Sequence, residues 1–160
     1  MCDNVQVMKS YTFGLLQTTA FKGLKGFTTS LLKPYGLTTY QWALLGILYE
    51  RKAGLGTTQL AKELQVSKPF ITKAVQTLID TGWVEKSDVI ETDLRATRFI
   101  LTPATRKKVP LIEKQLKLEM KKVLSGVSKI QLFAYIVVLK YISEKLSDSV
   151  DDSAYEVRNT

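Results

Sequence analysis

Residues 58–86, TQLAKELQVSKPFITKAVQTLIDTGWVEK, contain the pattern that decides the fold of this chain. They predict a short helix over 58–64, then a tight turn, then a second helix. Ser67 is a favourable N-cap for the second helix because its hydroxyl can accept a hydrogen bond from a free backbone N–H, and Pro69 is tolerated in the first turn. The apolar residues of this helix recur at i, i+3, i+4, i+7 and i+8, which predicts one buried stripe: Ile71, Ala74, Val75, Leu78 and Ile79.

A β-hairpin is expected directly after this helix, which ends at Gly82. Residues 83–86 and 96–101 are rich in β-forming types and can pair as two strands around a polar loop with its tip at 91–95. Helix, turn, capped helix and hairpin in this order form a winged helix-turn-helix. The predicted fold class is therefore mainly α with a small β-hairpin wing.

Further helices flank this winged segment. They are predicted at about residues 5–32, 38–53, 103–124 and 129–146. Capping boxes, in which two side chains satisfy each other's free backbone N–H groups, mark two of the starts: Thr38 with Gln41, and Ser128 with Gln131. Pro110 removes one hydrogen bond inside the long helix, so we expect a kink there.

The composition excludes several kinds of chemistry. The 160 residues include no histidine, and Cys2 is the one cysteine, so a Cys/His metal cluster and a histidine-activated nucleophile are both excluded. We therefore expect no enzymatic activity and no metal or cofactor. An enzyme on a helical scaffold stays the alternative, and it would need a deep cleft with convergent titratable groups. No secretion signal or membrane span is visible, so we expect a cytoplasmic protein.

Three stretches resemble the multiple-antibiotic-resistance regulator (MarR) family, in matching order and spacing. Residues 37–45, LTTYQWALL, are similar to the opening of the family's second helix. Residues 58–86 resemble its helix-turn-helix. The DLR of residues 93–95 and the LT of residues 101–102 resemble its wing tip and the entry to its next helix. With the flanking helices, the resemblance covers about residues 5–146.

The resemblance implies a DNA-binding transcription regulator, more often a repressor than an activator in this family. A homodimer would set two recognition helices about one DNA turn apart, so the expected target is a pseudo-palindromic site in double-stranded DNA. The expected parts are an N-terminal dimerisation helix, a winged helix-turn-helix DNA-binding lobe, C-terminal linker and dimerisation helices, and an acidic, disordered tail. Their predicted boundaries are residues 1–36, 37–102, 103–146 and 147–160.

The exposed side of the helix after Ser67 suits a DNA major groove, which admits one α-helix. Lys68 and Lys73 can neutralise phosphates or bond to guanine, and Gln76 can pair with adenine. Short side chains allow close approach to the DNA backbone. The candidate DNA-binding residues of this helix are Ser67, Lys68, Pro69, Thr72, Lys73 and Gln76. The alternative is that they form only the solvated face of an amphipathic helix.

Arg95 at the predicted wing tip can enter the adjacent minor groove, where the potential is most negative. By the resemblance, Asp93 orients this arginine and Arg98 supports it from the strand. Asp88 and Glu91 add further carboxylates, so this wing is poorer in cations than the family pattern. The alternative is a surface salt bridge that contributes little.

The net charge of +8 indicates an anionic partner, but the charge is unevenly distributed. Residues 62–98 carry six basic and six acidic groups, whereas residues 99–129 carry eight basic and two acidic ones. We expect the long charged helix, which holds most of the surplus, to be a solvated face. Because the basic and acidic groups of residues 62–98 balance, a second function is possible from the sequence: a winged-helix protein-interaction module without sequence-specific DNA binding.

The first and last helices are apolar on most sides, and such helices must be buried. A chain of this size has limited interior, so we expect these helices to interlock with those of a second copy in a twofold dimer. The alternative is a monomer that packs both helices in its own core.

A small organic effector is a further expectation from the resemblance, because members of the family bind such molecules between their lobes. The aromatic residues that could border the pocket are Tyr11, Phe13, Tyr40 and Trp42. Aromatic residues at these spacings are also typical of plain core. Cys2 has no basic neighbour in sequence that would lower its pKa, so a redox role is not expected.

Overall fold

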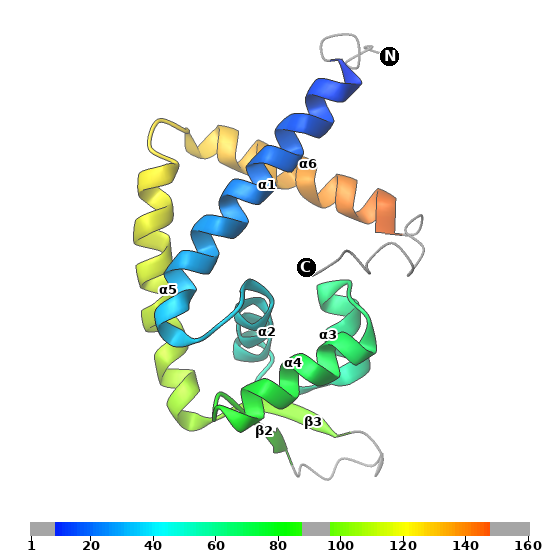
Figure 1. The fold of residues 1–160 in the computed structure, drawn as a ribbon, viewed down its shortest axis with the longest axis vertical. Coiled ribbons are helices and arrows are strands. Elements are labelled where there is room, and N and C mark those ends of the chain that lie inside the picture. The colour runs from blue at the N-terminus through cyan, green and yellow to red at the C-terminus, as the bar shows by residue number, and fades with distance from the viewer. Residues whose placement is uncertain (1–8, 88–96, 148–160) are drawn as a thin grey trace. The chain divides into compact units, whose positions relative to one another are not determined.

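The computed structural model describes residues 9–87 and 97–147 (Figure 1). Its elements are α1 (Ser10–Leu32), a 3-10 helix η1 (Lys33–Tyr35), α2 (Thr39–Glu50), β1 (Leu55–Gly56), α3 (Thr57–Leu64), α4 (Lys68–Asp80), β2 (Val84–Ser87), β3 (Arg98–Leu101), α5 (Pro103–Val123) and α6 (Lys129–Ser147). The mainly helical winged fold is therefore confirmed. The chain divides into two compact units, Met1–Trp42 and Ala43–Thr160. None of the described helices has the length and apolar character needed to span a membrane.

The N-terminal unit contains α1, η1 and the first turn of α2. Gly36 follows η1 with a φ of 67°, a left-handed conformation that favours glycine and turns the chain between the helices. The predicted capping box is confirmed. The Thr38 N–H donates to Gln41 Oε1 at 2.8 Å, and the Gln41 N–H donates to Thr38 Oγ1 at 3.2 Å. These two bonds fix where α2 begins.

The C-terminal unit contains the helix-turn-helix, in which α3 packs against α4. Gln65 in the turn adopts a left-handed conformation with a φ of 53°. The stripe predicted for α4 is confirmed, because Ile71, Val75 and Leu78 are buried. The remaining two predicted members, Ala74 and Ile79, are half-buried.

The sheet has three antiparallel strands in the order β1-β3-β2, so the predicted two-stranded hairpin omitted β1. β3 pairs with β2, with Val84 opposite Leu101. It also pairs with β1, with Leu55 opposite Phe99. A strand of two residues is too short to produce the alternation by which strands are recognised in a sequence.

Gly54 allows β1 to approach β3. Its φ is 74°, and a Cβ at this position would lie 2.7 Å from the Phe99 carbonyl oxygen and 2.7 Å from Ile100 Cγ2. Both the left-handed backbone and the close approach require a residue without a side chain. The third strand therefore depends on this glycine.

Thr102 joins the wing to the start of α5. Its hydroxyl accepts from the Thr105 N–H at 3.3 Å and donates to the Gly82 carbonyl at 3.1 Å. Its own N–H donates to the Trp83 carbonyl at 3.2 Å. The end of β3, the end of α4 and the first turn of α5 are thus held together by one residue.

Arg106 links α5 to the end of α2. Its guanidinium donates to the Tyr49 carbonyl at 3.1 Å and the Leu48 carbonyl at 3.5 Å, and it lies 5.5 Å from the centre of the Tyr49 ring. A cation at a helix C-terminus satisfies free carbonyl groups and interacts favourably with the helix dipole. α5 continues through Pro110 without a break, and the kink expected there stays a prediction.

α6 begins at the second predicted capping box, which is also confirmed. The Ser128 N–H donates to Gln131 Oε1 at 2.9 Å, and the Gln131 N–H donates to Ser128 Oγ at 3.2 Å. None of the described side chains of α6 is buried within the single chain. Its exposed large apolar residues are Ile130, Phe133, Tyr135, Ile136, Val137, Val138, Tyr141 and Leu146.

Replacing Gly54 by alanine should lower the free energy of unfolding by about 1–3 kcal/mol, because the new Cβ meets β3 and a positive φ strains alanine. Urea unfolding followed by circular dichroism measures the change. Gly46→Ala is the matched control. It lies inside α2, a Cβ there meets nothing within 4 Å, and we expect it to raise stability by about 0.5–1 kcal/mol. Equal effects of the two variants would contradict the role given to Gly54.

Candidate nucleic-acid interface

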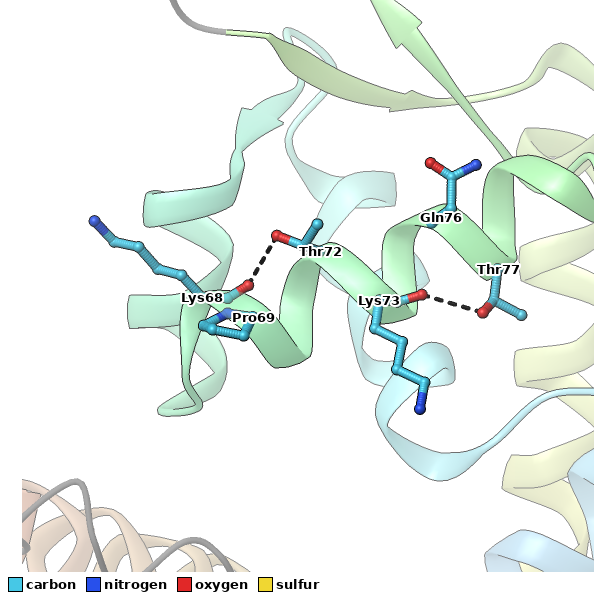
Figure 2. Close-up of a pocket in the computed structure, with 6 residues that line it drawn as sticks. All are labelled: Lys68, Pro69, Thr72, Lys73, Gln76 and Thr77. Atoms are coloured by element: carbon cyan, nitrogen blue, oxygen red, sulfur yellow. Dashed lines mark hydrogen bonds between the residues drawn. The ribbon is translucent and has the colours of Figure 1, made fainter.

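The exposed side of α4 forms a shallow groove, which we call the α4 groove (Figure 2). Its lining residues are Lys68, Pro69, Thr72, Lys73, Gln76 and Thr77. The opposite side of the same helix carries the buried stripe described above. The groove residues are therefore fixed outward by the packing of their apolar neighbours.

Local interactions set both ends of α4. Ser67 is the N-cap, as predicted, and its hydroxyl accepts from the Phe70 N–H at 3.4 Å. Pro69 lies in the first turn, where its missing N–H removes no helical hydrogen bond. At the other end, Gly82 has a φ of 73°, and the Trp83 N–H donates to the Leu78 carbonyl at 2.8 Å. The helix thus has defined ends as well as a defined rotation.

The groove residues form two adjacent rows along α4. One row is Lys68, Thr72 and Gln76, and the other is Pro69, Lys73 and Thr77, since residues four apart lie above one another on a helix. In Figure 2, Thr72 and Gln76 extend from one side of the helix and Lys73 from the other. A ligand lying along the groove can therefore meet both rows.

Both threonine hydroxyls in the groove donate to the helix itself. The Thr72 hydroxyl donates to the Lys68 carbonyl at 3.0 Å, and the Thr77 hydroxyl donates to the Lys73 carbonyl at 3.1 Å (Figure 2). Their protons are used in these bonds. Each threonine consequently offers an incoming partner its methyl group and its oxygen lone pairs.

The two lysines supply the positive charge of the groove. Both are exposed, and neither ammonium group has an acidic partner among residues 9–87 and 97–147. Lys68 also lies in the first turn of α4, where the helix dipole favours an anion. This end of the helix is therefore suited to a phosphate.

The remaining predicted residues belong to the segment that was predicted as the wing. Arg98 is in β3, half-buried, and opposite Ser87 of β2 and Gly56 of β1. Asp93 and Arg95 lie outside the described residues. The structure brings five of the six candidates at α4 together in one groove; the sixth, Ser67, caps the helix and does not line the groove. Their role in DNA binding stays a prediction.

Two polar residues of α4 were missed by sequence reasoning. Thr77 lines the groove, and Asp80 extends the row of Gln76 by one turn. The Gln76 amide donates from Nε2 to Asp80 Oδ1 at 2.7 Å. Spacing by four residues would have identified both, from Lys73 and from Gln76 respectively.

The four residues of the predicted effector pocket all lie in the N-terminal unit. Tyr11 and Phe13 are exposed in the first turns of α1, whereas Tyr40 and Trp42 lie in the first turns of α2. From Phe13 to the end of α1 the helix runs for about 28 Å, at 1.5 Å per residue. The two pairs therefore form no single pocket along this helix, and effector binding stays a prediction.

The chemistry of the α4 groove is that of binding. It offers two ammonium groups, one amide, hydroxyl lone pairs and methyl groups, with no histidine anywhere in the chain. Among the described residues, no group of three or more His, Cys, Asp or Glu side chains could hold a metal ion.

Comparison with known proteins finds a match to one family model and a shared fold. The model of the MarR family matches residues 35–95, a segment that includes α2, α3, α4 and two of the three strands. No curated protein matches the sequence.

Solved structures of this family share the fold. A MarR transcriptional regulator from Methanosarcina mazei Go1 has a TM-score of 0.73 and 22% identity, over 89% of this chain and 94% of that one. The S. aureus MepR–DNA complex has a TM-score of 0.71 and 21% identity, over 87% and 99%. A mutant of E. coli MarR complexed with operator DNA has a TM-score of 0.71 and 18% identity, over 82% and 93%. At identities of 18–22%, the likeness shows a shared fold alone.

Proposed function

We propose that this chain is a DNA-binding transcription regulator of the MarR type that performs no catalysis, since residues 35–95 match the model of that family. The observation that carries the proposal is the α4 groove. It combines two lysines, neither paired with an acidic group of the described residues, and short polar side chains on the exposed side of a helix whose other side is buried. The similar folds of MepR and MarR in complexes with DNA support it.

In the proposed complex, α4 lies in the major groove of the duplex. Lys68 and Lys73 contact phosphates, and the N-terminal end of α4, where the helix dipole favours an anion, faces a phosphate. Thr72, Gln76 and Thr77 face the base edges. This division gives affinity to the cations and selectivity to the neutral side chains.

The wing completes the proposed contact. Arg95 would enter the minor groove beside the site of α4, with Asp93 orienting it and Arg98 supporting it from β3. Half-burial of Arg98 in the sheet supports a role in holding the wing rather than in reading bases.

We propose that the protein acts as a homodimer. α1 exposes large apolar side chains, including Tyr11 at 68% and Leu15 at 65%, and α6 exposes Ile130 at 81% and Phe133 at 69%. Apolar surface of this extent on two helices is unfavourable in water and is typical of a surface that another chain covers. A twofold pair would present two copies of α4 to a pseudo-palindromic site.

Regulation would follow from the distance between the two copies of α4. A ligand that binds better to the dimer with one spacing of the two helices shifts the population toward that conformation and so changes the affinity for DNA. We propose repression of the bound promoter as the output, with an organic effector as the input.

Removal of the two groove lysines tests the proposal. The double variant Lys68→Ala, Lys73→Ala should bind about tenfold or more weakly, at moderate salt, to a duplex selected from a random library by the wild-type chain. The slope of the logarithm of the binding constant against the logarithm of the salt concentration should fall in magnitude by about 0.9 for each phosphate that the protein no longer neutralises. Fluorescence anisotropy over a series of salt concentrations measures both. The matched control is Lys114→Ala with Lys121→Ala, which removes the same charge from exposed positions on α5.

Equal losses of affinity in the two double variants would contradict a specific role for the α4 groove.

The rival function is a protein-interaction module, favoured by the balanced charge of residues 62–98 and by Phe70, which is 39% exposed on α4. It predicts no measurable duplex binding by the wild-type chain at any salt concentration.

A charge placed on α6 tests the dimer. Phe133→Glu should convert the dimer to a monomer, because a buried carboxylate without a partner is strongly unfavourable. Sedimentation velocity measures the mass, with Ser125→Glu, an exposed position before α6, as the control that stays dimeric. A monomeric wild-type chain, or an unchanged mass for Phe133→Glu, would contradict the proposed assembly.

A further inference from the structure

We infer that Asp80 is a positioning residue that holds the Gln76 amide in the orientation that selects adenine in an A·T base pair. The inference rests on the proposed function, since it needs α4 to lie in a major groove. It adds a residue outside the α4 groove and assigns a base to one position of the site.

The contact between the two side chains fixes the amide. Gln76 Nε2 donates to Asp80 Oδ1 at 2.7 Å, and the residues are four apart on the exposed side of α4. A carboxylate accepts hydrogen bonds and does not donate them, so the NH2 end of the amide must face Asp80. Gln76 Oε1 and the second N–H of Nε2 are then left for a partner.

This pair of free groups matches adenine. In the major groove adenine offers the N6 amino group as a donor and N7 as an acceptor, so Gln76 Oε1 can accept from N6 while the second N–H donates to N7. Guanine offers two acceptors, O6 and N7, and Gln76 Oε1 would face O6 without a proton between them. The amide held by Asp80 therefore favours adenine over guanine.

The neighbouring threonines agree with an A·T pair. The hydroxyl protons of Thr72 and Thr77 are engaged by backbone carbonyls, so these side chains offer methyl groups and acceptors. A threonine methyl suits contact with the C5-methyl group of thymine. Among the described residues that line the groove, the free charged donors are the two lysines, which are suited to phosphate.

Nothing else in the described structure accounts for Asp80. No cation pairs with it among residues 9–87 and 97–147, and it lies in the last turn of α4, where the helix dipole disfavours a negative charge. A carboxylate near DNA also repels phosphate. Orientation of Gln76 is the favourable interaction that the structure gives this side chain.

The test compares two replacements of Asp80 in the full-length chain. A site is first selected from a random duplex library, and affinities are then measured for duplexes that differ from it by one base pair. Asp80→Ala removes the acceptor, and we expect the preference for A·T over G·C at one symmetric pair of positions to fall about fivefold or more. Asp80→Asn keeps an acceptor oxygen at the same reach without the charge, and we expect it to retain the preference.

A double-variant cycle separates positioning from a direct contact. If Asp80 acts through Gln76, then Gln76→Ala combined with Asp80→Ala should show the same base preference as Gln76→Ala alone. Thermal melts report whether each variant is folded. Because Asp80 is exposed, its replacement leaves the core residues of α4 in place.

Each outcome decides the inference. The inference would be overturned if Asp80→Ala kept the wild-type preference for A·T over G·C at every position. It would also be overturned if Asp80→Ala and Asp80→Asn lost that preference equally. Either result would leave the proposed function intact. A wild-type chain that binds no duplex would overturn both.

Discussion

Burial of one side of α4 is the constraint on which the proposed function depends. Ile71, Val75 and Leu78 are each at most 2% exposed, and each contributes about 1.5–3 kcal/mol by leaving water. Rotation of the helix by one residue would place Thr72 and Gln76 in the core and Ile71 in solvent. The stripe therefore determines which side chains are free to meet a partner, and those are the residues of the α4 groove.

The rest of the C-terminal unit holds α4 in place. The Thr102 hydroxyl bonds to the carbonyl of Gly82, directly after α4, and Arg106 bonds to the end of α2. Gly54 lets β1 join the sheet that packs beside the helix. A rigid frame of this kind matters for recognition, because base selection by hydrogen bonds requires side chains that are held in position before the partner arrives.

Sequence reasoning succeeded where local chemistry decides the structure. The capping boxes, the cap at Ser67 and the stripe of α4 each depend on residues a few positions apart, and all were correctly predicted. It failed for β1, because the fit of Gly54 against β3 joins segments more than forty residues apart. It missed Asp80 because this residue carries the charge least expected near DNA, although its spacing of four residues from Gln76 was a signal for their hydrogen bond. The apolar first and last helices predicted a second copy, but the contacts between two chains are not encoded in the spacing of residues within one.

The most direct test of the account asks where α4 lies on DNA. An iron chelate attached to Thr72→Cys, in a Cys2→Ser background so that the attachment is unique, cuts the DNA nearest to the α4 groove when hydroxyl radicals are generated. Two copies of α4 in successive major grooves should give two clusters of cuts related by twofold symmetry, with centres about 10 base pairs apart. The same chelate at Ser125→Cys should give no such clusters. Scattered cuts, or identical patterns from the two attachment points, would contradict the placement of α4 in the major groove.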